Sequence, residues 1–75
     1  MLLGVLMPLD LELSPGLPAL AGVMSVLHAR RVSPSSIAWT DGTPIARLVL
    51  DVQGSDLELL TRQLSRRVDV REVKR

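Results

Sequence analysis

The side chains that could carry out chemistry are few and widely separated along this chain. It holds one histidine, His28, and no cysteine or tyrosine. His28 lies at helical spacing beside Arg30 and Arg31, which is typical of a histidine at the surface or end of a helix. A metal site needs more ligands than one imidazole and scattered carboxylates can offer. We therefore expect neither a metal site nor a resident cofactor.

Hydroxyl and carboxylate groups favour catalysis no more than His28 does. Ser33, Ser35 and Ser36 are close together, but no base that could activate a hydroxyl lies near them in sequence. Asp10 and Glu12 alternate with leucines, so a strand would place both carboxylates on its outer, solvated side rather than in an acid–base pair. The sequence therefore indicates a chain that is not an enzyme.

The best candidate for ligand contact is the segment Ser14-Pro15-Gly16-Leu17. It lies between a predicted strand and a predicted helix, where Gly16 would allow the backbone to approach a ligand closely. The free backbone N–H groups at a helix N-terminus suit a carboxylate. A plain turn between strand and helix explains the same residues, and both interpretations stay open at this point.

Two elements are predicted in the first half of the chain. Residues 9–13 alternate between leucine and acidic residues, which predicts a strand with one buried face. This strand could begin as early as Leu2, with Pro8 at a bulge or an edge position. A helix is predicted from near Pro18 to Arg30, because apolar residues recur there at helical spacing. Its expected buried residues are Leu20, Val23, Met24 and Leu27.

The second half begins with a predicted hairpin. Residues 36–40 and 45–52 are the two strands, joined by a tight two-residue turn at Asp41-Gly42. The second of these strands is apolar on both faces, which places it in the middle of a sheet. Gly54 then ends the strand.

A helix and a last strand complete the predicted elements. Ser55 and Glu58 form the pattern of a capping box, which opens a helix over residues 56–66. Glu58 and Arg62 are an expected ion pair on its outer face. The final strand is predicted at residues 68–70. The expected inner stripe of the helix is Leu57, Leu60, Thr61 and Leu64.

Two strand–helix–strand halves in 75 residues predict a single domain, residues 1–75, of the α+β class. The order βαββαβ is that of a ferredoxin-like two-layer sandwich, in which both helices cover one face of a four-stranded antiparallel sheet. We expect the other, open face to carry an exposed apolar patch that meets a partner. The predicted interface residues are Ile37, Trp39, Ile45 and Val49, with Arg47 at the rim.

Composition limits the partners and the compartment. The net charge of +1 is too small to attract nucleic acid, and no apolar run approaches the ~20 residues of a membrane span. The N-terminal apolar run lacks a preceding basic residue and soon meets Asp10 and Glu12, so we expect no signal peptide. The absence of cysteine fits a reducing compartment, and we expect a cytoplasmic protein. So small an aliphatic core also favours burial against a second subunit.

Three stretches of the chain share their order and spacing with a known family. They are residues 23–30 (VMSVLHAR), residues 36–39 (SIAW), and residues 60–64 with 68–73 (LTRQL and VDVREV). Together they resemble the first helix, second strand and closing helix and strand of the ACT domain, a regulatory amino-acid-binding module. More narrowly, the chain resembles a short regulatory (small) subunit of acetolactate synthase, also called acetohydroxyacid synthase. The likeness covers most of residues 9–74.

The resemblance implies a noncatalytic regulatory subunit that binds and activates the larger catalytic subunit of acetolactate synthase in branched-chain amino acid biosynthesis. Thiamine diphosphate, Mg²⁺ and flavin would belong to that large subunit. It also implies a homodimer paired through sheet edges, with a small amino-acid effector at Ser14-Pro15-Gly16-Leu17. Arg31 stands where the family usually has a glycine after the first helix.

Two other functions remain alternatives. The first is a standalone ACT-like domain that senses a small amino acid at a dimer interface. The second is a small enzyme of the same fold, such as an acylphosphatase, which the scarcity of polar groups disfavours.

Overall fold

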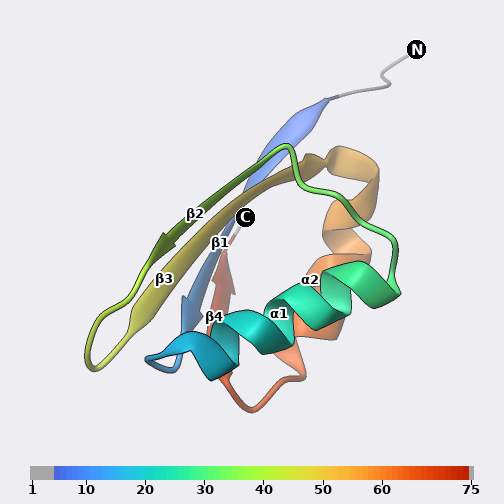
Figure 1. Ribbon diagram of the computed structural model, residues 1–75. Helices are drawn as coiled ribbons and strands as arrows, with labels where there is room; N and C mark the ends of the chain where they lie inside the picture. Colours follow the sequence, from blue (N-terminus) through green and yellow to red (C-terminus); the bar gives the residue numbers. More distant parts are fainter. Residues whose placement is uncertain (1–4, 75) are drawn as a thin grey trace.

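A computed structural model describes residues 5–74 of the chain, which form one sheet and one layer of helices (Figure 1). The elements are β1 (Leu6–Leu13), α1 (Leu17–Ala29), β2 (Ser36–Thr40), β3 (Ala46–Gln53), the 3₁₀ turn η1 (Gly54–Asp56), α2 (Leu57–Ser65) and β4 (Val70–Lys74). The strands form one antiparallel sheet in the order β2-β3-β1-β4. This confirms the predicted ferredoxin-like α+β architecture. The strand start predicted near Leu2 lies outside the described residues.

The two central strands decide which side chains are buried. β1 and β3 pair along their whole lengths, from Leu6 opposite Gln53 to Leu13 opposite Ala46. Side chains alternate between the faces of a strand, and those on the helix-facing side are aliphatic. This inner set is almost completely buried and consists of Leu9, Leu11, Leu13, Ala46, Leu48, Leu50 and Val52. The position of β3 inside the sheet is therefore as predicted.

Both helices lie against this single face of the sheet (Figure 1). α1 buries Ala19, Val23 and Leu27, which recur every four residues. Leu20 and Met24, predicted to be buried, are only half-buried beside this stripe. The buried residues of α2 are Leu57, Leu60 and Leu64, three of the four predicted. Neither helix within residues 5–74 is long and apolar enough to cross a membrane.

Pro8 lies where β1 has a neighbour on one side only. β4 pairs with β1 over Asp10–Leu13, so the earlier part of β1 pairs with β3 alone. The N–H of Gly54 donates to the carbonyl of Val5 (2.8 Å), so odd-numbered residues of β1 direct their backbone groups toward β3. Pro8 therefore faces the flank that no described strand occupies, where a missing N–H costs no ladder bond. The edge position is confirmed, and the bulge lies between Glu12 and Leu13 instead.

The predicted two-residue hairpin turn is wrong. β2 ends at Thr40 and β3 begins at Ala46, so a five-residue loop joins them, and its Thr43–Pro44 peptide bond is cis. The last pair of the hairpin is Thr40 with Arg47, not Thr40 with Thr43. The loop is held toward α1 instead of closing tightly, because Oδ1 of Asp41 accepts the N–H groups of both Gly16 and Gly42.

The predicted capping box does not form. Ser55 lies within the 3₁₀ turn, and Asp56 at the N-cap of α2 makes no hydrogen bond through its side chain to cap the helix. The 3₁₀ turn places Ser55 one residue too early, since the α-helix itself starts at Leu57. The predicted outer ion pair is present, with 3.6 Å between Glu58 Oε1 and an Arg62 guanidinium nitrogen.

The last strand starts two residues later than predicted. Val68 is 99% exposed, and β4 begins at Val70. Arg67 and Asp69 form a two-pronged ion pair in the intervening turn, with Nε to Oδ1 at 3.0 Å and Nη2 to Oδ2 at 3.1 Å, and this hydrogen bonding raises the pKa of Arg67. The guanidinium lies over Gly22 of α1, where a Cβ would clash with it. The glycine within α1 thus makes room for this turn.

A Schellman turn ends α1. The N–H of Val32 donates to the carbonyl of Leu27 (2.9 Å), and the N–H of Arg31 donates to the carbonyl of His28 (3.1 Å), which are the two hydrogen bonds of this motif. Val32 and Leu27 both belong to the core. Arg31 has a φ of 58°, a left-handed conformation that glycine usually supplies. The side chain of Arg31 therefore adds strain where the hydrogen bonds fix the backbone.

Replacing Arg31 with glycine should stabilise the protein. Relief of roughly 1 kcal/mol of left-handed strain, partly offset by the freedom of glycine in the unfolded chain, should raise the free energy of unfolding by about 0.5 kcal/mol. Arg30 is the matched control, because its φ of −91° needs no glycine. Arg30→Gly should lower the free energy of unfolding by about 0.5–1 kcal/mol. Urea denaturation measures both, and a fall for both variants would contradict the assigned strain.

Candidate functional site

The predicted ligand segment lies at the N-terminus of α1, and its key donor is already engaged. Gly16 has a φ of 98°, and its N–H donates to Oδ1 of Asp41 (2.9 Å). The same oxygen accepts the N–H of Gly42 (3.0 Å). The N–H of Ser14 donates to the carbonyl of Asp69 (2.9 Å). The segment is thus tied to two other loops at this end of the sheet.

Asp41 supplies the negative charge that α1 lacks in its own sequence. The helix has no acidic residue in its first turn and no side-chain hydrogen bond at its N-cap, Gly16. The carboxylate of Asp41 comes from the β2–β3 loop, 25 positions away, and lies where the helix dipole favours an anion. Sequence reasoning assigned Asp41 only to a turn, because nothing local signals this contact. Pro15 and Leu17 of the predicted segment are exposed.

Two of the predicted interface residues lie on the opposite face of the sheet from the one expected. Ile37 pairs with Leu50 and Trp39 with Leu48, so both side chains point toward the helices. Trp39 is half-buried against the core, and Ile37 is 51% exposed because β2 is the edge strand. The expected position was wrong. The sequence contains enough information to place both side chains. The observed loop and the predicted two-residue turn both pair odd-numbered residues of β2 with even-numbered residues of β3, whose side chains face the helices.

The open face carries charged residues where an apolar patch was expected. Ile45, Arg47 and Val49 do lie there, as the alternation predicts. Of these three, Arg47 forms ion pairs with carboxylates of β1. Arg47 lies 3.5 Å from a carboxylate oxygen of Asp10 and 3.7 Å from one of Glu12. The ion pairs extend to β4, where Lys74 Nζ lies 3.3 Å from Glu12 and 3.6 Å from Glu72.

The neighbouring carboxylates stabilise the charged form of Lys74. Its hydrogen bond to Glu12, together with the charges of Glu12 and Glu72, raises the pKa of Lys74. These groups are solvent-exposed to different degrees, so each pair contributes little to folding on its own. Their collective effect is to hold the outer side chains of β1, β3 and β4 in one charged layer.

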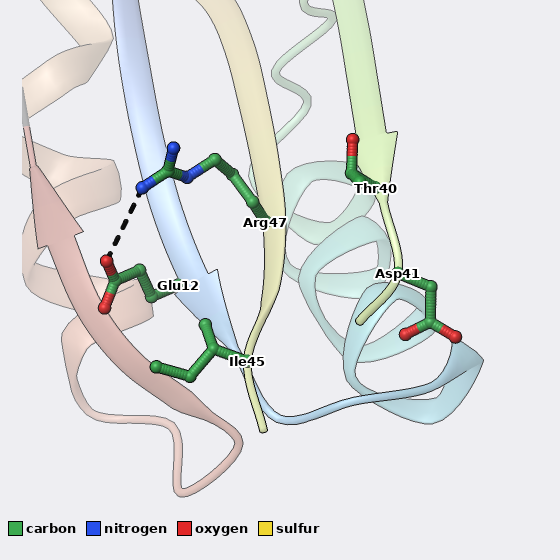
Figure 2. A pocket seen from close by; sticks show the side chains of 5 residues that line it. All are labelled: Glu12, Thr40, Asp41, Ile45 and Arg47. Atoms are coloured by element: carbon green, nitrogen blue, oxygen red, sulfur yellow. Dashed lines mark ion pairs between the residues drawn. The ribbon is translucent and has the colours of Figure 1, made fainter. Parts of the chain in front are cut away.

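A shallow hollow of about 510 Å³ lies at one end of the open face. In Figure 2, Arg47 extends from β3 toward Glu12 on β1, and Ile45 lies directly before the start of β3. Thr40 and Asp41 line the β2 side of the hollow. The lining therefore combines two carboxylates, one guanidinium, one hydroxyl and one aliphatic side chain.

The remaining chemistry-bearing residues do not line this hollow. His28 is exposed near the end of α1. The Ser36 hydroxyl donates to a carboxylate oxygen of Asp51 (2.7 Å) on the open face, so this serine meets an acidic group. Within residues 5–74, no three histidine or acidic side chains lie where they could share a metal ion.

Comparison with protein-family models finds no match for this chain. A search of curated proteins likewise finds no significantly similar sequence.

Removing the Asp41 carboxylate should free the N-terminus of α1. Asp41→Ala deletes the acceptor for Gly16 N–H, so its amide hydrogen exchange should accelerate and the free energy of unfolding should fall by about 1 kcal/mol. Asp41→Asn keeps an acceptor oxygen and should have a smaller effect. Asp56→Ala is the control, because Asp56 makes no capping hydrogen bond. Exchange measured by NMR at Gly16 that is equally fast in wild type and Asp41→Ala would refute the link.

Proposed function

We propose that this chain is a noncatalytic regulatory subunit that forms a homodimer through the free edge of β2. In this proposal the dimer binds and activates the larger catalytic subunit of acetolactate synthase, in branched-chain amino acid biosynthesis in the cytoplasm. The βαββαβ fold is compatible with the ACT-like module suggested by residues 23–30, 36–39 and 60–73. The single observation that carries the dimer is the unprotected edge of β2.

Within residues 5–74 three flanks of the sheet have no pairing strand, and two of them carry features that hinder strand addition. Along β4 the ladder is interrupted by a bulge, and Lys74 places a charge near its end. The free flank of β1 presents Pro8, which has no N–H. Bulges, lysines and prolines are the devices by which proteins protect edges.

β2 has none of these devices. Its sequence SIAWT contains no charged residue and no proline, and it pairs with β3 without a register shift. The backbone N–H and C=O groups of even-numbered residues of β3 point to β1, so those of its odd-numbered residues point to β2. These odd-numbered residues lie opposite Ser36, Ala38 and Thr40. The backbone groups of Ile37 and Trp39 therefore point outward. A second copy paired there would complete their hydrogen bonds and cover Ile37.

The amino-acid sensor is less well supported by the contacts at Gly16. An effector carboxylate that used this N–H would have to displace the tethered carboxylate of Asp41. We therefore place the subunit interaction first and effector binding second.

Blocking the outward groups of β2 should separate the dimer. Ile37→Pro removes an N–H that points away from β3, so it costs no bond within the chain but deprives the pairing edge of a donor. Ile37→Lys adds a charge to the same edge. Each should raise the dimer dissociation constant by roughly tenfold or more, measured by sedimentation or light scattering. Leu59→Lys, at a partly exposed leucine of α2, should leave it unchanged. A monomeric wild type would contradict edge pairing.

The regulatory role is tested by adding the purified chain to the purified acetolactate synthase large subunit of the same host. Near-stoichiometric co-elution with a rise in synthase activity supports the proposal. If the chain neither binds nor changes activity, the proposal fails. A thermal-shift screen with amino acids then tests the sensor, because a ligand that binds the native state raises the melting temperature.

A further inference from the structure

The open face of the sheet is acidic although the chain as a whole is basic. The register places four carboxylates on it, Asp10, Glu12, Asp51 and Glu72, together with the cations Arg47 and Lys74. Arg71 adds a third cation, because it is exposed at the bulge of β4 between Val70 and Val73, which pair with buried leucines of β1. The face therefore carries one excess negative charge, whereas the net charge of the chain is +1.

Aliphatic side chains lie on both sides of Arg47 on the same face. Val49, which pairs with Ala38, follows Arg47 by two residues, and Ile45 precedes it by two residues and lines the hollow. Val49 is half-buried and Ile45 is 42% exposed. Aliphatic surface next to carboxylates suits the side chains of lysine and arginine, whose apolar stems cover such surface while their charges reach acidic groups.

We infer that the open face of the sheet docks a lysine- or arginine-bearing segment of the catalytic partner subunit. This inference rests on the proposed function and adds the surface and the sign of its charge. The partner's cations would face Glu12, Asp10 and Glu72, and a basic side chain would enter the hollow along Ile45, toward Glu12. Complementary charge of this kind guides association and selects the partner.

The proposed homodimer leaves this surface available. Pairing at the β2 edge extends the sheet sideways and covers neither of its faces. Two copies of the open face would repel each other, because each carries excess negative charge. A basic segment from a different subunit is the occupant that this charge favours.

The test uses variants that alter the charge of the face in both directions. Glu12→Gln with Glu72→Gln makes the face less acidic, and Lys74→Gln makes it more acidic. The control, Asp56→Asn with Glu58→Gln, removes the same charge from the start of α2. Affinity for the purified acetolactate synthase large subunit is measured by surface plasmon resonance at low and high salt, with circular dichroism to verify folding.

Opposite shifts in the two face variants support the inference. The double glutamine variant should bind roughly tenfold more weakly and with less salt dependence, Lys74→Gln should bind about two- to threefold more tightly, and the control should match wild type. Wild-type binding that all variants retain, or that both face variants lose, overturns the inference and leaves the proposed function standing. No binding by the wild type overturns both.

Discussion

The antiparallel pairing of β1 with β3 is the contact on which the rest of the structure depends. Its register places Leu9, Leu11 and Leu13 beside the even-numbered aliphatic residues of β3, and all of them lie under the helices. The same register brings Asp10 and Glu12 to Arg47 on the other face. A slip of one residue would exchange the two faces. Hydrophobic burial on one side and ion pairing on the other thus specify a single arrangement.

Periodicity within a segment predicted the elements well and their ends less well. The alternation in residues 9–13 and the two-sided apolar run of β3 gave the central strands, and the leucine spacing gave α2. The ends depended on contacts that a local pattern does not contain. η1 displaced the start of α2, and the Arg67–Asp69 pair over Gly22 delayed β4.

The candidate site was harder to derive because its contacts join distant parts of the chain. The hydrogen bond from Gly16 to Asp41 links the β1–α1 and β2–β3 loops, so no spacing rule could show that the helix N-terminus was occupied. The face that Trp39 occupies follows from which residues the hairpin pairs, whereas its apolar character alone does not distinguish an interface residue from a core contact. Arg47 had a role that no single-strand pattern shows, since its partners lie on β1.

Trp39 has an optical consequence. It is the only aromatic residue of the chain, and it lies half-buried on the edge strand, against the core. Without tyrosine or phenylalanine, near-ultraviolet absorption and intrinsic emission both come from this one indole. The wavelength of that emission depends on how much water reaches the ring, which the neighbours of β2 control. The molecule therefore carries a single built-in fluorophore at the margin of its sheet, so events at that margin can be followed without attaching a dye.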